Sequence, residues 1–284
     1  MRLWHCAYNL KQIGLALLSY HNAYKCFPPA CVRDASGKPM HSWRVLILPY
    51  MRRDDPDESK KCRDLYEKYS FKEPWNGPKN RVLESSIPPW VYVCPNVARD
   101  SVKEFALATY VLVTGPDTAF PGCKPRAPGE ITRRPCDTVL VVEAANTDIH
   151  WMEPRDPSLD DLVAGRAGVC RPLTGTHIER SYWRDPDRGS GNIVCGDGRV
   201  HFLRGPIGPE DARVLLTVND GQDFDVEEFA KRMPLSGRLR WDHIIGLPVF
   251  CLSFVGLMWL AVTTRRREKQ LAPEGSSATV EAPP

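Results

Sequence analysis

Near the start of the chain, apolar residues recur at the spacing of one helix face. Between residues 9 and 25 these positions are Leu10, Ile13, Leu17, Tyr20 and Tyr24, and Gly14 and Leu18 widen the stripe. The polar residues are Lys11, Gln12, Ser19 and Asn22. This pattern predicts an amphipathic helix over 9–25. Pro28 and Pro29 prevent its extension, because proline lacks a backbone N–H and restricts the residue before it.

Shorter patterns predict the elements that follow. A short helix or strand is expected around 43–51 and helices near 60–69, 209–216 and 226–232. Runs rich in apolar and β-branched residues predict strands at 90–93, 109–114, 138–143, 192–195 and 199–203. Helices first and strands later favour an α+β fold with an antiparallel sheet.

The dipeptide Asp197-Gly198 separates two runs in which apolar and polar residues alternate. Asp-Gly is a favoured two-residue hairpin turn, in which both residues take positive φ. We therefore expect a hairpin that joins the strands 192–195 and 199–203, with a structural role for the dipeptide.

The longest apolar run is 244–262, which begins at Ile244 and ends at Val262 without a charged residue. At about 1.5 Å per residue, a helix of this length spans the roughly 30 Å hydrocarbon core of a bilayer. Trp241 and Trp259 lie near its ends, where amphipathic rings favour the membrane interface. The run predicts one transmembrane helix, and a buried core helix is the alternative.

The charges that flank this run leave its orientation open. Lys231, Arg232, Arg238 and Arg240 precede it, and Arg265, Arg266, Arg267 and Lys269 follow it. Basic residues mark the cytoplasmic side of a membrane helix, and here both sides carry them. Residues 263–284 are rich in Pro, Ala, Ser and Glu and are predicted to be a disordered tail.

Composition bounds the fold and the partners. The chain has 284 residues, of which 42% are hydrophobic, which is enough for one substantial core. Its 26 prolines and 20 glycines favour loop-rich connections over a helical bundle. The net charge of +3 comes from interspersed basic and acidic residues, so the sequence carries no electrostatic signature of a nucleic-acid-binding protein.

The ten cysteines show neither a Cys-x-x-Cys motif nor the spacing of a zinc site. Two pairs could close short loops in an oxidising compartment, Cys26 with Cys31 and Cys123 with Cys136. The alternative is a set of free, buried thiols that act as small apolar side chains.

Several collinear motifs resemble a large bacterial family, domain of unknown function 1559. The first motif begins at Asn9, three residues after Cys6, and the last motif ends at residue 203. The motif residues are Asn9, Leu10, Lys11, Gln12, Ile13, Gly14, Pro28, Pro29, Trp43, Pro49, Cys94, Pro95, Glu143, Asp197 and Gly198. Members typically carry prepilin-type N termini, and some are labelled family 10 solute-binding proteins.

The resemblance implies a pilin-like arrangement, in which the N-terminal helix lies across the sheet, and a domain outside the cytoplasm. Two positions depart from the family pattern. Only five residues precede Cys6, so we expect no N-terminal prepilin leader in this chain. Asp187 occupies the histidine position of the family's His-x9-Asp-Gly signature, so no role of that histidine is transferred.

Two groups of residues are candidates for ligand binding. Asp185, Asp187 and Asp197 could offer oxygen ligands to a divalent cation such as calcium, but their spacing matches no EF-hand, and we assign no metal site. Aromatic platforms that stack on sugars or peptides could come from Trp43, Trp75, Trp90, Trp151 and Trp183. Anchoring of the core is the more common role of such residues.

No nucleotide-binding, hydrolase or metalloprotease motif occurs. The nearest approach to a catalytic cluster is His150 with Glu153 and Asp156, which a polar surface loop explains more simply. Glu143 at the end of a predicted strand could be a buried base or a surface carboxylate. We therefore predict a protein that is not an enzyme and has no cofactor.

The sequence thus predicts a pilin-like domain over 1–220, a polar stem over 221–243, a transmembrane helix over 244–262 and a disordered tail over 263–284. The predicted function is that of a non-enzymatic, membrane-anchored, pilin-like structural or interaction protein of the bacterial cell envelope. Its expected partners are the lipid bilayer, through 244–262, and envelope protein subunits, with the domain outside and the tail in the cytoplasm. The alternative is a membrane-tethered module that binds solutes or glycans.

Overall fold

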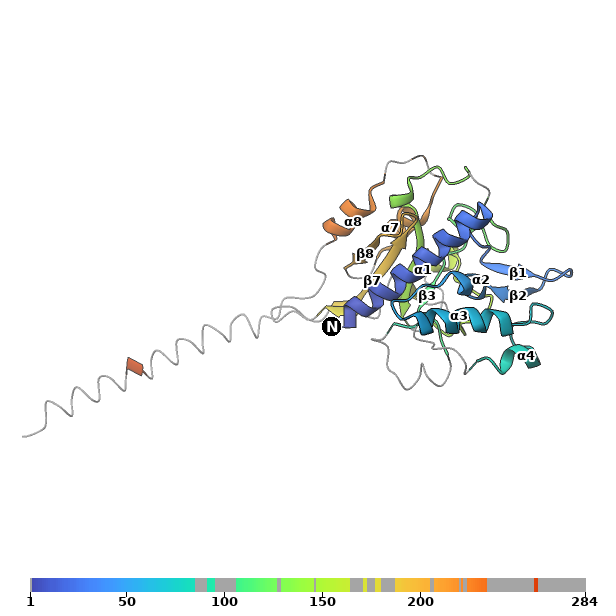
Figure 1. Cartoon of the computed structure of the whole chain (residues 1–284). Coiled ribbons are helices and arrows are strands. Elements are labelled where there is room, and N and C mark those ends of the chain that lie inside the picture. Colours follow the sequence, from blue (N-terminus) through green and yellow to red (C-terminus); the bar gives the residue numbers. More distant parts are fainter. Residues whose placement is uncertain are drawn as a thin grey trace, which may run out of the picture. The chain divides into compact units, whose positions relative to one another are not determined.

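The first helix, α1, covers Arg2–Tyr24 and lies against an antiparallel sheet (Figure 1). It begins closer to the N-terminus than the predicted helix, and Leu10, Ile13 and Leu17 of the predicted stripe are fully buried. Its end is fixed at Lys25, whose φ of 62° is left-handed and whose backbone N–H donates to the His21 carbonyl oxygen at 2.7 Å.

The computed structural model describes residues 2–84, 91–94, 106–126, 129–145, 147–163, 171–172, 177–179, 187–204, 207–219, 221, 224–233 and 258–259. One unit comprises Met1–Glu179 with Pro186–Ser236. The second comprises Arg180–Asp185 with Gly237–Pro284, and within it only the helical residues Met258 and Trp259 are described. The sheet, its covering helices and the candidate site all belong to the first unit.

The main sheet is antiparallel, with the strand order β3-β4-β7-β6. Strand β8 also pairs with β7, and β5 with β4. In sequence order the strands are β3 (Tyr110–Val111), β4 (Val139–Ala145), β5 (Arg171–Pro172), β6 (His177–Glu179), β7 (Asp187–Cys195) and β8 (Val200–Leu203). The predicted α+β class with an antiparallel sheet is confirmed.

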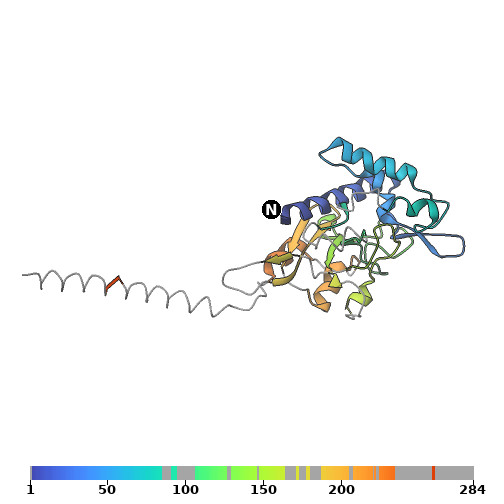
Figure 2. The ribbon, with the colours of Figure 1, turned by 90° about the horizontal axis from the view of Figure 1, so that it is seen from below.

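Each face of this sheet carries its own apolar core, because neighbouring strand residues point to opposite faces. Leu140 of β4 and Val194 of β7 belong to the core beneath α1. Val142 and Ile193 belong to the other core, which three short helices cover: α6 (Leu159–Val163), α7 (Pro209–Leu216) and α8 (Val226–Arg232). Figure 2 shows these layers, with α1 between the sheet and a further helix, α3 (Pro56–Lys68).

A helix-rich segment lies between α1 and the sheet strands in the sequence. It contains a small hairpin, β1 (Cys31–Arg33) and β2 (Pro39–Ser42), followed by α2 (Trp43–Leu46), the 3-10 helix η1 (Leu48–Tyr50), α3 and α4 (Pro78–Arg81). The uncertain prediction at 43–51 is thus resolved as helix. Asp55 caps α3, since its Oδ1 accepts from the Asp57 N–H at 2.9 Å.

Two local predictions are corrected. Residues 91–94 form a turn rather than a strand, although all four are buried. The β7–β8 hairpin exists, but only Gly198 of the predicted pair has positive φ, at 80°. The Cys195 carbonyl oxygen accepts from the Gly198 N–H at 2.9 Å, so Gly196 and Asp197 are the two central residues of the turn. Gly198 follows them with its left-handed φ.

Beyond β8, helix α8 lies within the segment predicted to be a stem. It packs on β8 and on the 3-10 helix η3 (Pro135–Asp137), and its Val226 is fully buried. Among the described residues, no helix has the length and apolarity needed to cross a bilayer. The predicted span 244–262 lies outside the described residues except at Met258 and Trp259, and the predicted tail 263–284 lies outside them entirely.

Substitution of Gly14 tests the contact between α1 and the sheet. A Cβ atom at Gly14 would lie 2.6 Å from Cγ2 of Val194, so Gly14→Ala should lower the free energy of unfolding by about 1–3 kcal/mol through overpacking. Urea denaturation measures this change. In a Val194→Ala background the clash disappears, so the cost of Gly14→Ala should fall; an equal cost in both backgrounds would contradict a direct contact between Gly14 and Val194.

Candidate functional site

Two disulfides join segments that lie far apart in the sequence. Cys6 of α1 bonds to Cys94, with Cα atoms 5.2 Å apart and a sequence separation of 88. Cys31 bonds to Cys123 across a separation of 92. In the unfolded chain each bond would close a long loop, and such a loop corresponds to a stabilisation of about 4 kcal/mol in the chain-entropy account.

The two short-loop cysteine pairs considered from the sequence are therefore wrong. Cys26 and Cys136 are free. The partner of Cys31 is set by the tertiary fold, in which the Ala30 N–H donates to the Gly122 carbonyl oxygen at 2.9 Å and brings position 123 alongside β1. Sequence spacing carries no information about this contact.

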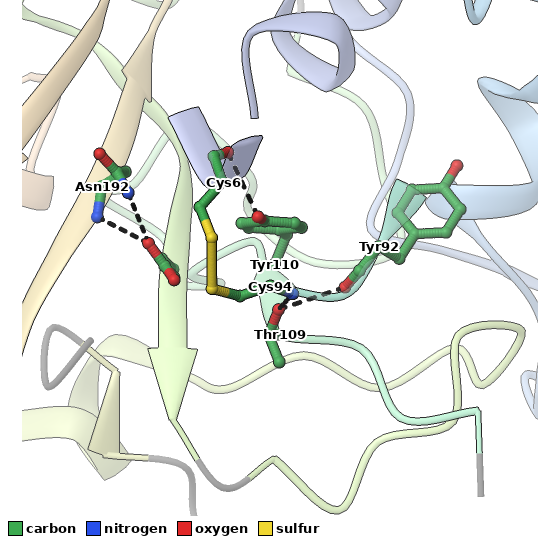
Figure 3. The surroundings of a disulfide bond; sticks show 7 residues. Cys6, Tyr92, Cys94, Thr109, Tyr110 and Asn192 are labelled. Atoms are coloured by element: carbon green, nitrogen blue, oxygen red, sulfur yellow. Dashed lines mark hydrogen bonds between the residues drawn. A yellow bond between two sulfur atoms is a disulfide. The ribbon is translucent and has the colours of Figure 1, made fainter. Parts of the chain in front are cut away.

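Buried polar groups surround the Cys6–Cys94 bond (Figure 3). Glu143 of β4 is 1% exposed, and its Oε2 accepts from the backbone N–H of Asn192 at 3.0 Å and from its Nδ2 at 2.7 Å. The Tyr110 hydroxyl donates to the Cys6 carbonyl oxygen at 3.2 Å. Burial, with nearby Glu143 as a smaller cause, raises the pKa of Tyr110 well above its ordinary value, so this hydroxyl remains a donor.

We call Cys6, Cys94, Glu143, Asn192 and Tyr110 the staple. It joins α1 to β3, β4 and β7, because each of these elements contributes one of its members. One turn further along α1, the Asn9 Oδ1 accepts from Arg53 Nη1 at 2.9 Å. The family-motif residues Asn9, Cys94 and Glu143 thus converge where the helix meets the rest of the domain.

The staple also contains potential metal ligands. One ligand atom from each of Cys6, Cys94 and Glu143 lies within 4.8 Å of the other two, and all three residues are buried. The two sulfur atoms are bonded to each other, however, and a coordinating cysteine must be a thiolate. In the disulfide state this cluster is therefore a covalent brace rather than a metal centre.

A second buried polar group contains the motif residue Trp43. Arg44 Nη2 lies 2.7 Å from Asp156 Oδ1, and both side chains are at most 1% exposed. Trp43 Nε1 donates to Asp156 Oδ2 at 3.0 Å and the Leu112 N–H to Oδ1 at 3.0 Å. Desolvation raises the pKa of Asp156 to about 6, and the Arg44 charge opposes this rise.

The structure brings Glu153 to His150, whose backbone N–H donates to Glu153 Oε2 at 3.2 Å, and gives Asp156 and Glu153 different ion-pair partners. Asp156 binds Arg44, whereas Glu153 forms an ion pair with Arg155 at 2.7 Å. His150 stacks on Trp75 with ring centroids 5.2 Å apart, and burial lowers its pKa.

The candidate metal-binding aspartates do not come together. Asp187 begins β7, while Asp197 lies in the turn beyond its other end, where it pairs with Arg199 at 3.3 Å. A strand of this length separates its ends by roughly 25 Å. Asp185 lies outside the described residues.

A groove of about 810 Å³ runs between α1 and the β7–β8 hairpin. Its walls include Trp4, Tyr8, Lys11, Gln12 and Leu15 from α1, and Asp197, Arg199 and Phe202 from the hairpin. Trp4 is 82% exposed and Leu15 is 40% exposed. Asn192 also lines the groove, so one residue of the staple contributes to its surface.

The sequence reasoning missed this groove, although a signal was present. Trp4, Tyr8, Lys11 and Leu15 recur at helical spacing and form a second face of α1, beside the buried stripe. The tryptophans considered from the sequence lie elsewhere: Trp43 and Trp151 are fully buried, Trp75 stacks on His150, and Trp90 and Trp183 lie outside the described residues.

These features define a class of protein: an α+β domain whose N-terminal helix lies on an antiparallel sheet and carries a disulfide next to a buried carboxylate. Residues 1–130 match the model of the family described as protein of unknown function (DUF1559), SBP_bac_10, and in this part the chain is similar to that family. The motifs around 138–143 and 192–203 lie beyond the matched residues. No curated protein and no solved structure matches the chain.

Two substitutions of Glu143 test its assigned role. Glu143→Ala leaves the Asn192 donors unsatisfied in a buried site and should lower the free energy of unfolding by about 1–3 kcal/mol. Glu143→Gln keeps an acceptor oxygen of the same shape and should cost less. Chemical denaturation of both variants measures the difference. An equal loss in both would show that the negative charge itself is required, contrary to a hydrogen-bonding role.

Proposed function

We propose that this chain is a non-enzymatic, membrane-anchored interaction protein of the bacterial cell envelope. Its pilin-like domain lies outside the cytoplasm, residues 244–262 are its membrane anchor, and it binds a partner subunit through the groove between α1 and the β7–β8 hairpin. The observation that carries the proposal is the exposure of Trp4 and Leu15 in that groove, because large exposed apolar side chains gathered in one place favour a binding surface.

The location outside the cytoplasm is supported by the two disulfides. Structural disulfides persist in oxidising compartments and are rare in the bacterial cytosol. The uncharged run 244–262 supports the anchor, since it is long enough for a bilayer.

The groove is better suited to binding than to catalysis. Its titratable lining residues include Lys11, Asp197, Arg199 and His201, and Asp197 is already paired with Arg199. Nucleophilic catalysis needs a nucleophile hydrogen-bonded to a base, and no lining residue offers this arrangement among the described contacts. Apolar walls with a charged rim are typical of protein-binding surfaces.

Glycan binding is the second candidate, and one observation favours it. The exposed ring of Trp4 lies in the same groove as Gln12 and Asp197, so an aromatic face and polar side chains line one surface. Tryptophan at a binding surface combines a broad apolar face with a hydrogen-bonding N–H.

Photocrosslinking in intact cells tests the proposal. A photoreactive phenylalanine analogue at Leu15, in the groove, should give one defined protein adduct, and Trp4→Ser should reduce it strongly. The same analogue at Val82, which is 72% exposed after α4, is the matched control and should give none of this adduct. Protease added outside the cells should remove the crosslinked domain.

Other outcomes would overturn specific parts of this proposal. Equal crosslinking from positions 15 and 82 would contradict a specific groove partner. An adduct that periodate oxidation destroys would identify a glycan instead of a protein. Protection of the domain from external protease would place it in the cytoplasm.

A further inference from the structure

The two cysteines of the staple lie beside a buried carboxylate, and this set of donors changes its chemistry when the disulfide is reduced. One ligand atom from each of Cys6, Cys94 and Glu143 lies within 4.8 Å of the other two. Bond lengths in a tetrahedral zinc site place sulfur and oxygen ligands roughly 3.6–3.8 Å apart, so a small adjustment would let all three meet one ion. We propose that these three residues bind one Zn²⁺ in the reduced chain, so that the disulfide and the metal are alternative links between α1 and residue 94.

Hydrogen bonds that do not involve sulfur hold the backbone of both cysteines. The Tyr110 hydroxyl donates to the Cys6 carbonyl oxygen at 3.2 Å, and the Cys94 N–H donates to Thr109 Oγ1 at 2.6 Å (Figure 3). Both cysteines are fully buried. Because these contacts do not depend on the sulfur–sulfur bond, the two thiols should stay close together after reduction.

Asn192 orients the third ligand. Its Nδ2 donates to Glu143 Oε2 at 2.7 Å, and carboxylates that bind metals are commonly held by such outer hydrogen bonds. Asn192 also lines the groove beside α1, so the site lies directly beneath a surface opening. Water from this opening can fill the fourth position of a tetrahedral ion.

The types of donor favour zinc over the hard cations. Calcium and magnesium prefer oxygen ligands, whereas thiolates favour zinc and other soft or borderline metals. Burial alone favours the neutral thiol, so a metal that stabilises the thiolate is needed to deprotonate a buried pair. Binding of Zn²⁺ to Cys6 and Cys94 therefore releases two protons.

Oxidation exchanges one link for the other in a balanced reaction, with glutathione disulfide as the oxidant. One protein thiolate attacks a glutathione sulfur and forms a mixed disulfide, and the first glutathione leaves. The second thiolate attacks the protein sulfur of that mixed disulfide, the second glutathione leaves, and Zn²⁺ is released. The two glutathiones take up two electrons from the protein and two protons from solvent. A reducing compartment thus favours the metal link, and an oxidising compartment favours the disulfide.

Cobalt binding to the reduced chain tests the proposal. Co²⁺ occupies the same tetrahedral thiolate sites as Zn²⁺ and absorbs light, whereas Zn²⁺ has a filled d shell and is colourless. The full chain is reduced with a phosphine, which is then removed in oxygen-free buffer, and Co²⁺ is added. We expect thiolate-to-cobalt absorption and tetrahedral d–d bands that saturate at one ion per chain and disappear when Zn²⁺ displaces the cobalt.

Variant chains assign the signal, since other cysteines are free. Cys6→Ala/Cys94→Ala should abolish the absorption, and Cys31→Ala/Cys123→Ala, which removes the other bonded pair, should retain it. Glu143→Gln should weaken cobalt affinity about tenfold or more and leave the thiolate absorption in place. Glu67→Gln, an exposed change on α3, should have no effect.

The zinc-loaded chain tests the exchange without any substitution. Glutathione disulfide should release one zinc per chain, detected with a chromogenic chelator, as the Cys6–Cys94 bond forms. Before oxidation, zinc at a hundred times its dissociation constant should lower the unfolded fraction of the reduced chain about a hundredfold. A reduced chain without thiolate–cobalt absorption would overturn the proposal, as would equal affinity in the Glu143→Gln chain or zinc that stays bound after the disulfide has formed.

Discussion

The attachment of α1 to the sheet is the constraint on which the rest of this structure depends. Three contacts along the helix support it: the Cys6–Cys94 bond to a buried turn, the Asn9–Arg53 hydrogen bond to the segment before α3, and the close approach of Gly14 to Val194 in the sheet itself. The covalent bond limits the freedom of the helix in every state of the chain. The hydrogen bonds of Glu143 then fix the strand beneath it, because they tie β4 to β7 at a buried point.

The positions of two cavities follow from this attachment. The groove has α1 as one wall and the β7–β8 hairpin as the other, so its width depends on how firmly the helix is held. A second cavity, of about 360 Å³, lies at the other end of the same helix, and Lys25 and Phe27 are among its lining residues. The family motifs are accordingly a signature of this interface: Asn9, Gly14, Cys94 and Glu143 all lie at it.

The local pattern of the sequence predicted the elements well where one face of an element is buried. Leu10, Ile13 and Leu17 predicted α1 by their helical spacing, alternating residues predicted β8 and the end of β7, and a continuous apolar run predicted β4. The apolar run 90–93 predicted a strand, yet its described residues 91–93 form a turn and are buried by tertiary packing. The helix was also predicted to begin too late, at residue 9, although Cys6 is fully buried and continues the stripe of Leu10 and Ile13 at helical spacing.

The sites were harder to predict because they depend on distances between separate segments. Nothing in the spacing of the cysteines pairs Cys6 with Cys94, and nothing near Asp156 in the sequence identifies Arg44 as its partner. Glu143 was considered as a buried base or a surface carboxylate, and its role became clear only with Asn192 beside it. Such partners are set by sheet register and helix packing, which a single sequence does not encode locally.

Hydrogen exchange of the native protein tests the central claim most directly. In a Cys6→Ala/Cys94→Ala chain, the amides of α1 should lose roughly two to three orders of magnitude of protection, since the loop constraint is lost. In a Cys31→Ala/Cys123→Ala chain, the loss should instead be centred on the β1–β2 hairpin. Unchanged protection of α1 in the first chain would show that the disulfide does not hold the helix, and would contradict the central role assigned to that bond.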